Sequence, residues 1–224
     1  MIVYTHGMAT MLASGARFDD EELHERLDEA FKGPVVARGR RARSCCGFQQ
    51  EGVYAMSRRL VIFDAGDIGG RGVRAGLFSD GNVLFSATPE VRMCIGCFGC
   101  WLKTPGTCVL RDRCQQMPRL LRESDTVVVV SPLVYGGYSR SVKAVFDRSI
   151  GYLLPYFRMV DGRMHHAMRY DHAYRQEVHF YGPGTQAEHD LAHRFIRANA
   201  VNFNVSEVDV RFHENVEQAK EAAL

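Results

Sequence analysis

An uninterrupted apolar run, Thr126-Val127-Val128-Val129-Val130, constrains the fold of this chain more than any other feature. Its β-branched residues do not alternate with polar ones, which is typical of a strand buried on both faces in a parallel sheet covered by helices. Ligands of such open α/β sheets bind beyond the carboxyl ends of the strands. The segment that follows the run is therefore the expected position of a binding site.

That segment, residues 131–138, reads Ser-Pro-Leu-Val-Tyr-Gly-Gly-Tyr. Gly136 and Gly137 let the backbone approach a ligand closely, and Tyr135 and Tyr138 offer flat aromatic faces. From these residues alone, two interpretations are open. The segment is either a ligand loop or a strand-to-helix turn whose aromatic side chains cover the core.

Cysteines before the run form a second pattern, C-x2-C-x2-C-x7-C, with Cys114 six residues further on. Thiolates at x2 spacing can converge on one metal centre, and a ferredoxin run uses the same first three positions. A Pro105-Gly106 turn between the third and fourth cysteines supplies a chain reversal. The candidate ligands are Cys94, Cys97, Cys100 and Cys108. Cys114 is expected to be spare, because it begins a predicted helix.

Residues 131–136, Lys143 and the pair Asp147-Arg148 together resemble the flavin loop of flavodoxin-like, NAD(P)H-dependent FMN reductases. The pattern of that family reads S-P-x-Y-x-G, then K, then D-R, and this chain carries one extra residue before the tyrosine. The resemblance covers about residues 58–212. It implies a flavodoxin-like fold, bound FMN, NAD(P)H as electron donor, and assembly as a homodimer or homotetramer with flavin near the subunit contact.

The same resemblance implies which residues meet the flavin. The backbone from Pro132 to Gly137 would face the isoalloxazine ring, and Tyr135 would pack against it. The residues expected to bind the cofactor are Ser131, Pro132, Leu133, Val134, Tyr135, Gly136, Gly137 and Tyr138.

The cysteine pattern resembles the compact motif of iron–sulfur flavoproteins, which belong to the same superfamily and accept electrons from reduced ferredoxin. Three interpretations of the motif are open. It is a [4Fe–4S] site, a structural zinc site with four thiolates around a tetrahedral ion, or a thiol-rich turn that packs near the flavin without a metal.

The expected phosphate loop departs from the family pattern. FMN-binding relatives have G-S-x-R-x-x-S/T after the first strand, and this chain has Asp-Ala-Gly-Asp-Ile-Gly-Gly-Arg-Gly at residues 64–72. Gly69, Gly70 and Arg71 could form an anion-binding nest, whereas Asp64 and Asp67 would repel a phosphate.

The remaining pattern predicts a doubly wound, three-layer α/β domain with parallel strands and right-handed crossovers. The strands are expected at residues 60–63, 81–87, 127–130, 176–181 and 205–212, and the helices at 114–122, 141–152 and 185–202. Residues 153–171 are expected to be a long connection. Leu191, Phe195 and Ile196 are expected to face inward from the last helix.

Composition is ordinary for a globular protein: 224 residues, 46% hydrophobic and 24% charged. The net charge of +2 does not favour a nucleic-acid partner. We expect no membrane span, because no apolar run is long enough. We also expect reduced cysteines and a cytoplasmic location, because the first residues lack the pattern of an export signal.

These features predict an FMN-dependent NAD(P)H oxidoreductase, with no catalytic side chain singled out because the flavin carries the chemistry. One alternative is an iron–sulfur flavoprotein for electron transfer. The other is a non-enzymatic flavodoxin-like module that has lost flavin binding. The physiological acceptor and the choice between NADH and NADPH are not encoded in any motif.

Residues 1–55 lack the strand-and-crossover pattern and are expected to be an extension, with a helix at 18–31, outside a domain at 56–224. Met56 is a plausible alternative start of translation. We predict that a chain beginning at Met56 keeps the thermal unfolding midpoint of the full chain, because a segment with few core contacts adds little stability. Thermal unfolding followed by circular dichroism checks this. A broadened, non-cooperative transition would show that the extension belongs to the core.

Overall fold

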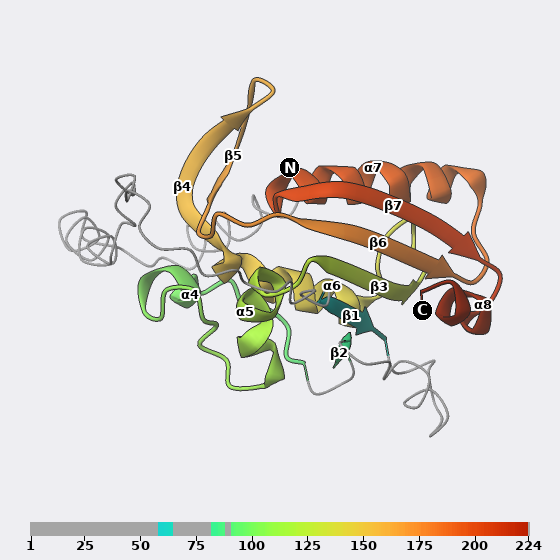
Figure 1. Ribbon diagram of the computed structural model, residues 1–224, viewed down its shortest axis with the longest axis horizontal. Helices are drawn as coiled ribbons and strands as arrows, with labels where there is room; N and C mark the ends of the chain where they lie inside the picture. Colours follow the sequence, from blue (N-terminus) through green and yellow to red (C-terminus); the bar gives the residue numbers. More distant parts are fainter. Residues whose placement is uncertain (1–57, 65–81, 88–90, 224) are drawn as a thin grey trace, which may run out of the picture.

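Five parallel strands form the centre of the protein in the order β2-β1-β3-β6-β7 (Figure 1). The computed structural model describes residues 58–64, 82–87 and 91–223. The strands are β2 (Asn82–Ser86), β1 (Arg59–Phe63), β3 (Thr126–Pro132), β6 (Tyr174–Tyr181) and β7 (Val205–His213). This strand order is the flavodoxin-like one, so the predicted fold class and all five predicted strands are confirmed.

The helices that surround the sheet lie between and after these strands. They are α4 (Gly99–Leu102), η1 (Arg113–Gln116), α5 (Met117–Arg122), α6 (Arg140–Asp147), η2 (Arg148–Tyr152), α7 (Gln186–Asn202) and α8 (Val216–Ala223). Two of them, α4 and α8, were not predicted. No helix in the described ranges combines the length and the apolar character that crossing a membrane requires.

Strand β3 is central because it pairs with β1 on one side and with β6 on the other. Its residues from Thr126 to Ser131 are all buried. Val127 and Val129 contribute to a core cluster shared with α5, α6 and α7. Val128 and Val130 contribute to a second cluster that includes residues of α8. The absence of alternation in the sequence therefore reflects helices on both faces of this strand.

Residues 153–168 form an antiparallel hairpin within the segment 153–171, which was predicted to be a long connection without strands. Strands β4 (Leu153–Val160) and β5 (Arg163–Met168) pair with each other and project away from the main sheet (Figure 1). Asp161 and Gly162 both have positive φ, 48° and 74°, which fits the two-residue turn that an Asp-Gly pair favours. That pair was the signal in the sequence that should have indicated a hairpin.

Helix α7 begins with a complete capping box between Thr185 and Glu188. Its buried residues are Ala192, Ile196 and Ala200, a stripe at intervals of four. Leu191 lies one position to the side of that stripe and is 43% exposed, so the prediction that it faces inward was wrong. Ile196 does face inward, and Phe195 packs half-buried against the core.

Several sequence expectations fall outside the described residues. These are the extension at 1–55 with its helix at 18–31, the chain start at Met56, and most of the phosphate-loop segment, residues 65–72.

Strands β6 and β7 carry a histidine pair. His179 is 1% exposed, and its Nδ1 lies 3.1 Å from Nε2 of His213. Burial, followed by the neighbouring His213 and Arg211, lowers the pKa of His179 to about 4. In the unfolded chain, His179 is protonated near pH 6.5, whereas in the folded chain it is protonated only near pH 4. Stability must fall as pH drops through this window.

We predict that His179→Gln flattens the pH dependence of the unfolding midpoint between about pH 4 and 6.5, because the titrating group that disfavours the folded state is gone. Thermal melts across that range measure the slope. The substitution His193→Gln on α7 is the matched control and should keep the wild-type slope. An unchanged slope in His179→Gln would assign the dependence to other groups.

Candidate functional site

The loop after β3 is held firmly at both ends. Ser131 is fully buried, and its Oγ accepts a hydrogen bond of 2.8 Å from the backbone N–H of Ser139. The Oγ of Ser139 accepts in turn from the N–H of Val142 and caps α6. The last residue of the buried part of β3 is thus tied to the first turn of the next helix. The residues between them form a loop of fixed span.

The tip of this loop is a tight two-residue turn. Val134 and Gly137 exchange two backbone hydrogen bonds of 3.0 Å each, and Tyr135 and Gly136 both have positive φ, 49° and 74°. Positive φ at both central residues is the geometry of a primed turn, and it is uncommon for a tyrosine. A Cβ at residue 136 would lie 2.9 Å from Leu191, so glycine is required there.

The two tyrosines of the loop have different environments. Tyr135 is 87% exposed, so the turn presents an aromatic ring to the surface. Tyr138 is buried, stacks on Phe146 with ring centroids 5.0 Å apart, and accepts a hydrogen bond from Gln176. The end of the segment covers the core, as one of the two sequence interpretations predicted, and its tip is a surface loop.

The four predicted cysteine ligands come together around one cavity. Its lining residues are Cys94, Ile95, Cys97, Phe98, Cys100, Cys108, Leu110, Arg148 and Ile150. The chain reversal expected at Pro105-Gly106 is present, because Gly106 has φ 84° and its N–H bonds to the carbonyl of Cys100 at 2.9 Å. This reversal brings Cys108 back to the first three thiols.

Helix α4 fixes the position of Cys100. The chain enters it through Phe98, which has φ 50°, and Trp101 donates from Nε1 to the carbonyls of Ile150 and Leu153 at 3.0 and 3.1 Å. A Cβ at Gly99 would lie 2.6 Å from Val109. This close packing joins the cysteine loop to η2 and to the start of β4.

Cys114 lies apart from the cavity, as the sequence predicted. Its side chain is fully buried, and Sγ lies 3.8 Å from the carbonyl oxygen of Val145. Burial raises the pKa of its thiol to about 12. Cys114 is therefore a packing residue of the core.

Burial affects two thiols of the cavity. Burial, with a smaller contribution from neighbouring thiols, raises the pKa of Cys94 and raises that of Cys100 to about 12. Thiolates in this setting require a compensating positive charge. A bound metal centre supplies one.

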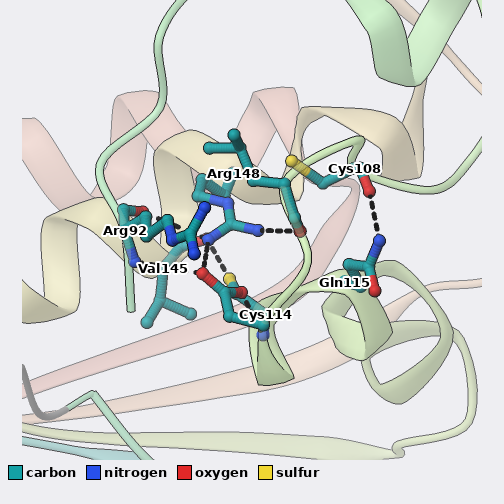
Figure 2. Close-up of polar contacts among 8 residues, drawn as sticks. Arg92, Cys108, Cys114, Gln115, Val145 and Arg148 are labelled. Carbon is teal, nitrogen blue, oxygen red and sulfur yellow. Dashed lines mark hydrogen bonds and ion pairs between the residues drawn. The ribbon is translucent and has the colours of Figure 1, made fainter. Parts of the chain in front are cut away.

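Figure 2 shows a polar network that sequence reasoning missed, and its Arg148 and Cys108 also line the cavity. The buried guanidinium of Arg148 forms an ion pair with Asp112 and donates to the carbonyls of Arg92 and Leu110 at 3.2 and 3.0 Å. Gln115 donates to the carbonyl of Cys108 at 2.9 Å. Burial opposes ionisation of Asp112, but the bond from Arg148 and the backbone N–H donors hold its pKa below the usual range.

The four thiols of the cavity are the residues that would hold a metal centre. Within the described part of the chain, no three Cys, His, Asp or Glu side chains stand close enough together to hold one ion. Four ligands of a zinc ion must meet at a single atom, whereas a [4Fe–4S] cluster takes one thiolate at each of four irons. Four thiols lining one cavity are the donor type that either centre uses.

Comparison with known proteins gives two kinds of similarity, and no family model matches the chain. The chain is 35% identical over 66 residues to an iron–sulfur flavoprotein of Archaeoglobus fulgidus, covering 30% of this chain and 29% of that protein. It is 35% identical over 63 residues to an iron–sulfur flavoprotein of Methanocaldococcus jannaschii, covering 28% and 32%. The match spans about a third of the length of these relatives. The similarity predicted from the cysteine spacing is confirmed.

Solved structures of similar architecture include an FMN-dependent NADH-azoreductase from Bacillus anthracis in complex with FMN, with a TM-score of 0.46 and 13% identity over 75% of this chain and 98% of that one. Another is the NAD(P)H:quinone oxidoreductase from Methanothermobacter marburgensis, with a TM-score of 0.47 and 13% identity over 75% and 98%.

Proposed function

We propose that the protein is an FMN-dependent NAD(P)H oxidoreductase. The observation that carries the proposal is the position of the Tyr135-Gly136 turn. In a flavodoxin-like sheet the strand order reverses between β1 and β3, and FMN binds at that switch point, beyond the carboxyl ends of the strands. The turn follows β3 at this edge of the sheet.

The residues of the loop fit a flat ring. Its ends are fixed by the Ser131–Ser139 hydrogen bond, and Tyr135 offers an exposed aromatic face. Bound FMN would supply hydride acceptance from the nicotinamide and electron transfer to an acceptor. The loop would bind and orient the ring. The matched relatives are also named as flavoproteins, which supports a flavin in this chain.

We predict that Tyr135→Ala weakens FMN binding by about 1–2 kcal/mol, the scale of one lost aromatic contact. Titration of FMN with protein, followed by quenching of flavin fluorescence, measures the dissociation constant. Tyr135→Phe is the matched control and should bind like wild type, because it keeps the ring. Absence of quenching by wild type would refute the flavin proposal, and equal affinity of Tyr135→Ala would remove this loop from the site.

A second candidate function is that of an iron–sulfur flavoprotein. The four thiols around one cavity favour it, as do the curated relatives. Here Cys94, Cys97, Cys100 and Cys108 would hold a [4Fe–4S] cluster. Such a cluster would supply one-electron transfer, with a reduced ferredoxin as the electron donor in place of NAD(P)H. The two candidate functions share the flavin. They differ in the [4Fe–4S] cluster and in the electron donor, which is NAD(P)H in the first and reduced ferredoxin in the second.

Assembly as a homodimer or homotetramer is part of the proposal. The β4–β5 hairpin exposes three large apolar side chains, Phe157, Met159 and Met164, each about two-thirds accessible. Apolar side chains gathered on a projecting element are typical of a protein contact.

We predict that Cys97→Ser loses the iron and sulfide that wild type retains after anaerobic purification, because one of four ligands is missing. Cys114→Ser is the matched control and should retain both, since Cys114 lies in the core. Iron and acid-labile sulfide are measured per chain. Absence of iron from wild type would favour a thiol-rich turn with flavin as the sole cofactor. Iron that depends on Cys114 and not on Cys108 would identify a different fourth ligand.

A further inference from the structure

Arg148 forms part of the wall of the four-cysteine cavity. It is the first residue of η2, and its side chain has no solvent-accessible surface. A buried charge is unfavourable unless it is paired and hydrogen-bonded. The position of this arginine among thiols therefore requires an explanation.

Two of the three guanidinium nitrogens of Arg148, Nη1 and Nη2, donate hydrogen bonds. Nη1 binds the carboxylate of Asp112 and the carbonyl of Arg92, and Nη2 binds the carbonyl of Leu110. Nε is buried and makes no hydrogen bond within the described part of the chain. A buried donor without an acceptor is an exception in folded proteins, and an unseen ligand is one explanation of it.

Electrostatics keep this guanidinium charged. Arginine stays protonated in folded proteins, and the carboxylate of Asp112 lies against this guanidinium. The cavity therefore has a permanent cation in its wall. The potential of an iron–sulfur cluster depends on net charge and on hydrogen bonds to its sulfurs.

We propose that Arg148 is a positioning residue of the cysteine site, which compensates thiolate charge through Nε–H and raises the reduction potential of the cluster held there. This role rests on the proposed [4Fe–4S] site. Removing the Arg148 cation destabilises the reduced cluster, which is the more negative state, and so lowers the reduction potential. Removing the Asp112 carboxylate stabilises the reduced cluster and so raises the potential. A purely structural ion pair would give the same direction of change in both cases, because either substitution breaks the pair.

The test compares midpoint potentials of the full chain, purified anaerobically, by optical redox titration at one fixed pH. We expect Arg148→Met to favour the oxidised cluster about tenfold, which is about 59 mV for one electron. Asp112→Asn should shift the potential in the opposite direction, and Arg148→Lys should stay near wild type. Arg175→Met, which removes an exposed guanidinium from β6, is the matched control and should leave the potential unchanged.

Iron content and thermal melts of each variant separate the possible outcomes. Cluster retained in Arg148→Lys and lost from Arg148→Met supports the role of the charge. The proposed role is overturned if Arg148→Lys and Arg148→Met both lose the cluster and Asp112→Asn keeps the wild-type potential. Potentials that move in the same direction in Arg148→Met and Asp112→Asn, or do not move, overturn this role alone. Wild type without iron overturns the proposed cluster together with this role.

Discussion

The buried ion pair between Arg148 and Asp112 connects η2 to the segments that flank the cysteine loop. Through it, η2 reaches the backbone at Arg92 and Leu110, on both sides of the cysteine loop. Asp112 also caps η1 by accepting from the N–H of Cys114. Breaking a buried pair by removing one partner costs about 3–5 kcal/mol. The shape of the cysteine cavity therefore depends on two side chains 36 positions apart.

A second region of the molecule depends on β3. Burial on both faces fixes this strand, and the Ser131–Ser139 bond carries that rigidity into the loop beyond it. The loop and the cysteine cavity are held by different parts of the fold. Strand β3 and α6 position the loop, whereas α4, η1 and η2 position the thiols. The proposed flavin loop and the proposed cluster site therefore depend on different structural elements.

The sequence predicted what depends on local pattern. The valines of β3 identified the central strand, and the cysteine spacing identified the residues that line one cavity. Leu191 was misplaced because a helix of period 3.6 buries the stripe through Ala192 and Ile196 instead. The β4–β5 hairpin was missed although Asp161-Gly162 indicated it. The contacts of Arg148 could not be predicted, because its partners are separated from it by 36 to 56 positions and no periodicity in the sequence indicates such contacts.

The close approach of Gly136 to Leu191 has a mechanical consequence. A single added carbon at residue 136 would lie 2.9 Å from Leu191. The turn therefore packs closely against the first half of α7. Packed interiors transmit small displacements instead of absorbing them. A side chain at residue 136 would therefore have to displace Leu191, and with it the first half of α7, or the turn itself.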